Sequence, residues 1–304
     1  MPATAAFRHE AIFYAGPEAF LDRVTPFVQE GVAAGEPVMV ALEAPKRDAL
    51  RSRLGTGTDG VVFADMGDIG HNPACILPAW TDFVAGRSGP MRGVGEPIWP
   101  GRSPDELVEC QCHEALLNNA FAGAAGFHLV CPYDAVHLDR DVIAEAERSH
   151  PWVGAAESAR YRGPEGAPPQ FSEPLPAAPG SPVEHRVAHE TLPEIRTLVA
   201  EHARQAGVSE LRAGDLVLAA HEVATNTLRH GGGEGVMRVW HDNGTVICEV
   251  RDRGRLDKPL AGRARPELGE GGGWGLWLAN QLCDLVQLRT LPDGSVVRLH
   301  LRDY

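Results

Sequence analysis

The hydrophobic positions of residues 11–150 form short apolar runs that alternate with longer amphipathic segments. Short apolar runs predict buried strands, whereas apolar residues that recur every three or four positions predict helices. The expected strands cover 11–16, 37–43, 60–65, 91–97 and 127–133, and the expected helices cover 17–35, 45–55, 77–86, 103–123 and 139–150. Strands and helices in strict alternation predict an α/β domain with a mostly parallel sheet.

The pattern changes in the last part of the chain, where helices come before strands. Two amphipathic helices are expected at 192–206 and 211–230, and a third at 275–285 after a loop rich in glycine and arginine. The expected strands cover 235–242, 245–254, 286–291 and 295–301. Helices beside an antiparallel set of strands predict an α+β two-layer sandwich.

A proline-rich stretch separates these two regions. Residues 158–182 carry seven prolines and few apolar side chains, which is typical of a semi-extended linker. We therefore expect a first domain over 8–152, a linker over 153–182 and a second domain over 183–304. A chain of 304 residues is long enough for two domains, each with a core of its own.

The charge and the apolar runs narrow the class of protein. The net charge is −13, which argues against nucleic acid as a direct partner. No apolar run reaches the length of a membrane span, and the N-terminus lacks a signal-peptide core, so a cytoplasmic protein without a membrane partner is expected. The six cysteines are irregularly spaced, which disfavours a disulfide framework. Cys110, Cys112 and His113 resemble a metal cluster, but positions two apart on a helix point to different faces, so buried thiols are the favoured interpretation.

The helix expected at 211–230 carries an unusual polar stripe. Its spacing places Glu222, Asn226 and Arg229 on one face, opposite the apolar positions. A carboxylate and a carboxamide that lie together are suited to Mg²⁺, which prefers oxygen ligands and often shares them with substrate phosphates. An ordinary solvated helix face is the alternative.

Two further features strengthen the first interpretation. Asp252 ends a predicted strand two residues before Gly254, and Gly271, Gly273 and Gly275 precede a helix at every second position. Glycines allow a close approach of the backbone to a ligand, and the N–H groups at a helix start bind phosphate. The arginine-rich segment between these features suits either a lid or a contact with an acidic protein partner.

The stretches "HEVATNTLRHG", "DRG" and "GGGWGL" occur in this order and resemble the N, G1 and G2 boxes of the GHKL ATPases, whose domain has the Bergerat ATP-binding fold. The resemblance covers nearly all of 183–304 and is strongest to the bacterial anti-sigma factor serine/threonine kinases. It implies that ATP and Mg²⁺ are the cofactors. It also implies a catalytic glutamate at Glu222, which orients the acceptor as a general base, and a Mg²⁺ ligand at Asn226.

The same resemblance implies the remaining contacts of the nucleotide. The implied ATP-binding residues are Asn226, Arg229, His230, Asp252, Gly254, Gly271, Gly273, Gly275, Leu276 and Ser295. Asp252 would accept the adenine amino group, and the contact at Ser295 rests on a weaker third box, "PDGSVV". Trp274 departs from the arginine that is common between the last two glycines of this box, which puts a phosphate contact at that position in doubt.

The resemblance also implies partners and a reaction. The protein would phosphorylate a serine or threonine of a STAS-type anti-sigma factor antagonist and would bind a sigma factor when the antagonist is absent. Dimeric relatives imply a homodimer by analogy. Two alternatives stay open: a module that sequesters a sigma factor without catalysis, and a histidine-kinase-like protein that acts with a separate phosphoacceptor.

The first domain has a resemblance of its own. The stretches "GEPIWPG", "HEALLNNAF" and "CPYD", with the strand and helix that open the chain, resemble the MEDS sensory domain over residues 8–152, which is thought to be RecA-like. The chain has no P-loop motif, so a second ATP site is not expected. The candidates for binding an unknown small-molecule or protein signal are His9, Glu96, Trp99, His113 and Tyr133, although structural roles remain the alternative for each.

Overall fold

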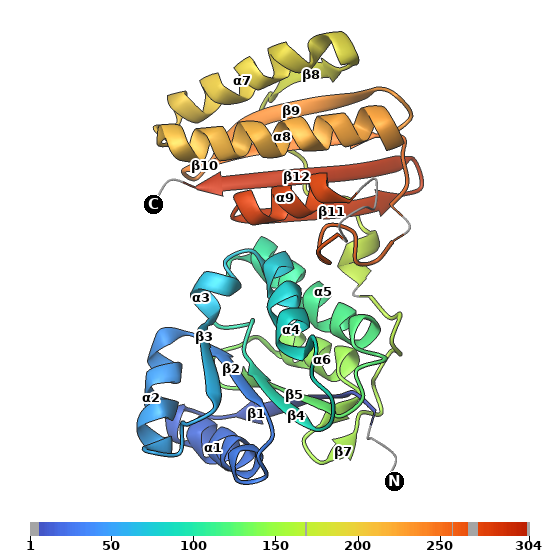
Figure 1. The fold of residues 1–304 in the computed structure, drawn as a ribbon. Helices are drawn as coiled ribbons and strands as arrows, with labels where there is room; N and C mark the ends of the chain where they lie inside the picture. Colours follow the sequence, from blue (N-terminus) through green and yellow to red (C-terminus); the bar gives the residue numbers. More distant parts are fainter. Residues whose placement is uncertain (1–5, 168, 257, 267–272, 303–304) are drawn as a thin grey trace. The chain divides into compact units, whose positions relative to one another are not determined.

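The computed structural model describes residues 6–167, 169–256, 258–266 and 273–302. The chain divides into two compact units, residues 1–168 and residues 169–304. Figure 1 shows both units along the chain, and each is described by itself. In the described parts of the chain, no helix is both long and apolar enough to cross a membrane.

The first unit is built on a seven-stranded sheet in the order β3-β2-β4-β5-β1-β6-β7 (Figure 1). Every neighbouring pair is parallel except β6 and β7. The strands are β1 (Arg8–Tyr14), β2 (Val38–Leu42), β3 (Val61–Asp65), β4 (Met91–Gly95), β5 (Phe127–Asp134), β6 (Trp152–Val153) and β7 (Ala156–Glu157). The helices are α1 (Pro17–Ala33), α2 (Ala44–Leu54), α3 (Met66–Ile69), α4 (Ile76–Val84), α5 (Pro104–Ala120) and α6 (Arg140–Ser149), with a 3₁₀ turn η1 (Pro73–Cys75). The predicted α/β domain with a mostly parallel sheet is therefore confirmed.

The glycines of β4 explain how one helix lies so close to this sheet. A Cβ atom on Gly95 would lie 2.7 Å from the indole ring of Trp80, and one on Gly93 would lie 2.9 Å from the same ring. Trp80 is the largest side chain of α4 and is almost completely buried. The strand therefore omits side chains at the positions where the indole packs.

The second unit is a five-stranded antiparallel sheet in the order β11-β12-β10-β9-β8. The strands are β8 (Val183–Val187), β9 (Gly235–Asp242), β10 (Thr245–Asp252), β11 (Leu285–Leu291) and β12 (Gly294–Arg302). Helices α7 (Leu192–Gln205), α8 (Glu210–His230) and α9 (Trp274–Leu282) pack against it through one continuous apolar core. The predicted α+β two-layer sandwich is confirmed, with β8 as a strand that the apolar pattern does not reveal.

Part of the expected linker packs onto the second unit. The 3₁₀ turn η2 (Pro169–Ser172) contains Phe171, and the guanidinium of Arg289 lies 4.3 Å from the centre of its ring. Arg298 Nη2 donates a hydrogen bond to the carbonyl oxygen of Pro176 at 2.6 Å. Leu175, which lies between Phe171 and Pro176 in the sequence, is also buried. The proline-rich stretch thus supplies packing contacts to strands β11 and β12.

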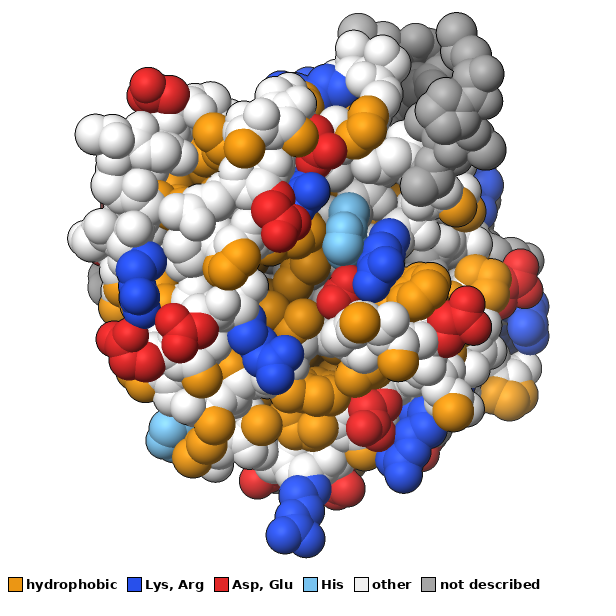
Figure 2. Space-filling model, turned by 90° about the horizontal axis from the view of Figure 1, so that it is seen from below, with side chains coloured by type: hydrophobic (Ala, Val, Ile, Leu, Met, Phe, Trp, Pro, Cys, Tyr) orange, Lys and Arg blue, Asp and Glu red, His pale blue; other side chains and the backbone are white. Residues whose placement is uncertain are grey.

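The surface in Figure 2 shows how the acidic excess is distributed on one face. Lys and Arg side chains lie interspersed with Asp and Glu side chains, and hydrophobic side chains gather near the centre. On this face the negative charge is therefore not gathered into a single patch.

Candidate nucleotide site

Helix α8 places the predicted polar stripe as the spacing requires. Ser209 is the N-cap of the helix, and its hydroxyl accepts a hydrogen bond from the Arg212 N–H. The last turn closes with the Gly231 N–H donating to the Thr227 carbonyl. Its apolar face is buried in the core of the second unit. Glu222 and Asn226 are only half-buried, so their polar groups lie away from that core.

The start of α9 lies directly against Glu222 and Asn226. A Cβ atom on Gly275 would lie 2.8 Å from Asn226 Nδ2 and 3.0 Å from Glu222 Oε2. Gly273 is the N-cap of α9 and has a φ of +94°, a left-handed conformation that glycine adopts without strain. The backbone N–H groups of the first turn of α9 therefore begin beside a carboxylate and a carboxamide, an arrangement that fits a metal-bound phosphate.

We expect Gly275→Ala to weaken ATP binding without loss of stability. The new methyl group meets the ends of two flexible side chains, so Glu222 and Asn226 move aside while the fold persists. Calorimetric titration with ATP and Mg²⁺ measures the effect. Gly214→Ala is the matched control, because Gly214 lies inside helix α8, a Cβ atom there would meet nothing within 4 Å, and alanine favours helix by about 0.5–1 kcal/mol. Unchanged affinity in Gly275→Ala would contradict the expectation.

The Asp252 carboxylate is held in one orientation at the end of β10. Its Oδ2 accepts a hydrogen bond from Thr227 Oγ1 at 2.7 Å, and its Oδ1 accepts one from Ser295 Oγ at 2.7 Å and one from the Gly254 N–H at 2.9 Å. A carboxylate has about four lone-pair sites, so acceptor capacity remains for the amino group of a base. The structure thus brings together Asp252, Gly254 and Ser295, and it adds Thr227, which the sequence analysis missed.

Two glycines let the end of α8 approach the end of β10. A Cβ atom on Gly231 would collide with the Asp252 carboxyl group, and one on Gly254 would lie 2.7 Å from the His230 carbonyl oxygen. The Arg253 N–H donates to the Gly231 carbonyl at 3.1 Å, which joins the two segments. The sequence could have identified Gly231 as a site residue, because Gly231 directly follows the polar stripe of α8.

The other predicted residues are placed as follows. The side chains of Arg229 and His230 are exposed at the end of α8, and Gly271 lies outside the described residues. Leu276 is half-buried and packs against the core of the second unit. Trp274 begins α9, with its ring 5.6 Å from that of Trp277.

The arginine-rich segment that was expected to act as a lid or to bind a partner makes several contacts within the domain. Arg251 Nε donates to Glu249 Oε1 at 2.7 Å, and Arg263 is buried. Asn280 Nδ2, from α9, donates to the Gly262 carbonyl at 2.9 Å. Arg251 and Glu249 belong to the same strand, β10, whereas the contact of Asn280 fixes the later part of the segment to α9.

The candidate residues of the first unit fall into different contact groups. Glu96 is completely buried after β4, and its Oε1 accepts hydrogen bonds from Tyr14 Oη at 2.7 Å and from Lys46 Nζ at 2.6 Å. Burial raises the pKa of the Glu96 carboxyl to about 7, although the Lys46 ammonium opposes the shift. Neither Tyr14 nor Lys46 was singled out in the sequence.

Trp99 packs elsewhere, under the guanidinium of Arg102 at 3.7 Å from the ring centre. His9 bonds to Glu114 and Asn118, while His113 and Tyr133 are both buried.

Two family models match the chain. Residues 8–151 match MEDS, the methanogen/methylotroph DcmR sensory domain, and residues 186–301 match the histidine kinase-like ATPase domain. No curated protein matches the chain. The second match spans the described candidate nucleotide residues, from Glu222 on α8 to Ser295 on β12.

Proposed function

From the premise that the chain joins a MEDS sensory domain to a histidine kinase-like ATPase domain, we propose that it is an anti-sigma factor with ATP-dependent serine/threonine kinase activity. The two domains by themselves make it an ATP-binding, kinase-like regulatory protein. In our proposal the acceptor is a serine or threonine of a STAS-type anti-sigma factor antagonist. The MEDS domain controls the choice between the antagonist and a sigma factor.

The observation that carries the proposal is the position of Glu222 and Asn226 opposite the start of α9. Bound ATP would supply the phosphoryl group, and Mg²⁺ would neutralise charge on its phosphates. Asn226 would hold the metal through its amide oxygen, and the first N–H groups of α9 would bind phosphate oxygens. Glu222 would accept the proton of the attacking hydroxyl, while Asp252 would accept the amino group of adenine.

The region before the ATPase domain favours this proposal over a self-contained histidine kinase. Such kinases carry their phosphorylated histidine on a helical dimerisation hairpin directly upstream. Here the described residues 6–167 form an α/β unit with a mostly parallel sheet. An acid-stable phosphate on the partner would support a serine or threonine acceptor, whereas an acid-labile phosphate would support a histidine.

We expect ATP to bind tightly only with Mg²⁺, and Asn226→Ala to remove most of that dependence. The alanine has no oxygen for the metal, so the affinity with Mg²⁺ should fall towards the affinity without it. Calorimetry of the full chain with and without Mg²⁺ checks this. The control is Gln205→Ala, which removes an exposed carboxamide at the end of α7. Absence of ATP binding by the wild type would leave a sequestering module as the better account.

A further inference from the structure

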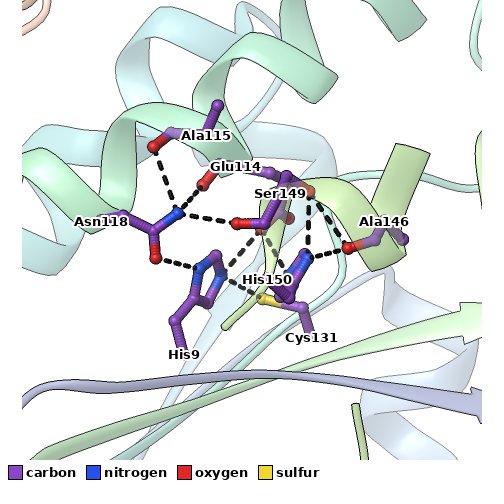
Figure 3. A network of polar contacts seen from close by, with 8 residues as sticks. All are labelled: His9, Glu114, Ala115, Asn118, Cys131, Ala146, Ser149 and His150. Carbon is purple, nitrogen blue, oxygen red and sulfur yellow. Dashed lines mark hydrogen bonds and ion pairs between the residues drawn. The ribbon is translucent and has the colours of Figure 1, made fainter. Parts of the chain in front are cut away.

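Four side chains with metal-ligating atoms converge inside the first unit (Figure 3). His9 comes from β1, Cys131 from β5 and Glu114 from α5, while His150 directly follows α6. Each is at most 1% exposed, and one ligand atom from each lies within 4.8 Å of all the others. Four elements that are distant in the sequence therefore bring nitrogen, oxygen and sulfur atoms to one buried point.

The closest contacts of this cluster centre on a single carboxylate oxygen. His9 Nε2 and His150 Nε2 lie 3.0 Å and 3.1 Å from Glu114 Oε2, and Cys131 Sγ lies 3.4 Å from His9 Nε2. His150 Nε2 is not in hydrogen-bonding geometry with any described residue. Glu114 Oε1 is also buried without a hydrogen-bond partner among the described residues.

The protonation of His9 follows from its other neighbour. Asn118 Nδ2 donates to the Ser149 carbonyl at 2.7 Å, so the amide oxygen of Asn118 must face the His9 ring. That oxygen lies 3.1 Å from His9 Nδ1 and can only accept a hydrogen bond. His9 therefore carries a proton on Nδ1, and its neutral form presents the Nε2 lone pair to Glu114.

The same reasoning applies to His150. Its Nδ1 lies 2.8 Å from the Ala146 carbonyl oxygen, which can only accept a hydrogen bond. Nδ1 is therefore the protonated nitrogen, and Nε2 of the neutral ring presents its lone pair to the same carboxylate oxygen. Histidines that bind metals donate their other N–H to a carbonyl or carboxamide oxygen in this way, which fixes the ring and its tautomer.

The lone pairs of the cluster meet at one point. With Nδ1 protonated in both rings, the Nε2 atoms of His9 and His150 face the Glu114 Oε2 atom at 3.0 Å and 3.1 Å. Groups that present only lone pairs to one another repel unless a proton or a cation lies between them, and one metal ion would satisfy all of these atoms together.

We propose that His9, Glu114, Cys131 and His150 together bind one divalent transition metal ion, with Zn²⁺ as the best match. Zinc takes tetrahedral sets of histidine, cysteine and carboxylate ligands, with bonds that separate the ligand atoms by roughly 3.3–3.7 Å. The three closest contacts are 3.0–3.4 Å and the remaining ligand pairs lie within 4.8 Å, so side-chain movements alone can bring the four atoms to these values. Binding forms a zinc–sulfur bond and releases the thiol proton of Cys131 to solvent.

The burial of all four ligands indicates a structural role for the metal. Four protein ligands complete a tetrahedral shell, whereas catalytic zinc sites keep one position open for water. The ion would tie β1 and β5 to α5 and to the end of α6. The sensory domain is then expected to lose thermal stability when a chelator removes the metal, and to regain it when Zn²⁺ is returned.

The test measures metal bound to the purified full chain. We expect one zinc per chain by elemental analysis, and we expect the Co²⁺-substituted protein to show a sulfur-to-cobalt charge-transfer band. Cys131→Ser should abolish that band and lower zinc affinity at least about 10-fold, since a loss of that size is already typical when a residue that only supports a ligand is changed. Cys110→Ser is the matched control, because Cys110 is equally buried and a hydroxyl can replace its thiol as donor to the Pro97 carbonyl.

X-ray absorption of the zinc-loaded wild type makes the test independent of how the variants fold. One sulfur at about 2.3 Å with three nitrogen or oxygen neighbours is expected. A wild-type protein that takes up neither zinc nor cobalt would overturn the proposal, as would a metal spectrum without sulfur. So would a charge-transfer band that is lost in Cys110→Ser and kept in Cys131→Ser. None of these results depends on ATP binding.

Discussion

Glu222→Gln is expected to lower the rate of phosphoryl transfer about 10²–10⁴-fold, the usual contribution of a positioned general base. Glutamine keeps the shape of the side chain but cannot take up the proton of the acceptor hydroxyl. ATP affinity should change little, because the nucleotide contacts proposed for Asn226, Asp252 and the start of α9 stay in place. The rate is measured as transfer from labelled ATP to the antagonist, and the affinity by calorimetry.

The control for this prediction is Glu210→Gln. Glu210 is an exposed carboxylate in the first turn of the same helix, so its neutralisation changes the charge of α8 without touching the site. Equal transfer rates in Glu222→Gln and the wild type would exclude Glu222 as the base. If neither protein transfers phosphate and both bind the sigma factor, the sequestering module becomes the better account.

Gly294→Ala is expected to destabilise the ATPase domain by about 2–4 kcal/mol, since it adds both backbone strain and overpacking. Gly294 has a φ of +145°, and a Cβ atom there would overlap the Asp252 carbonyl oxygen and lie 3.0 Å from Arg253 Cα. Both obstacles are backbone atoms of the neighbouring segment, so a rotamer change cannot relieve them. Urea denaturation of the full chain, followed by tryptophan fluorescence, measures the loss.

ATP affinity should fall together with stability in Gly294→Ala, because the added methyl group displaces the end of β10, which carries the Asp252 carboxylate. Gly244→Ala separates strain from collision, since Gly244 has a φ of +76° but nothing within 4 Å of the added methyl group. We expect Gly244→Ala to cost about 1 kcal/mol, the usual penalty for alanine in a left-handed position, and to leave ATP affinity unchanged. Equal stability losses in the two variants would show that the contact with Asp252 is unimportant.

The polar stripe on α8 illustrates what periodicity can predict. Glu222 and Asn226 are four positions apart, so any α-helix through them places both on one face, and the apolar pattern decides which face is buried. The order of the longer strands and helices in both units could be predicted for the same reason, whereas the short elements α3, β6 and β7 were not predicted. Strand β8 was not predicted, because four of its five side chains are exposed or half-buried and its sequence therefore shows no apolar alternation.

The proposed metal-ligand cluster of the first unit could not be predicted from the sequence. His9 was singled out, but its partners Glu114, Cys131 and His150 are more than 100 positions away, and no local pattern joins them. One signal was present in the stretch "ECQCHEALLNN", because α5 carries polar side chains on all sides and yet is mostly buried. Buried polar groups need partners, so such a helix indicates a polar network within the core.

The sequence by itself determined the two fold classes and the faces of their helices, because repeats of two and 3.6 residues follow directly from backbone geometry. Its three short boxes also singled out the residues of the candidate nucleotide site. Only the tertiary structure decided that Gly275 touches Glu222 and Asn226, that Thr227 and Ser295 hold Asp252, and that the proline-rich stretch packs on β11 and β12. These contacts join segments that are distant in the chain, and their geometry depends on how the layers pack rather than on any local repeat.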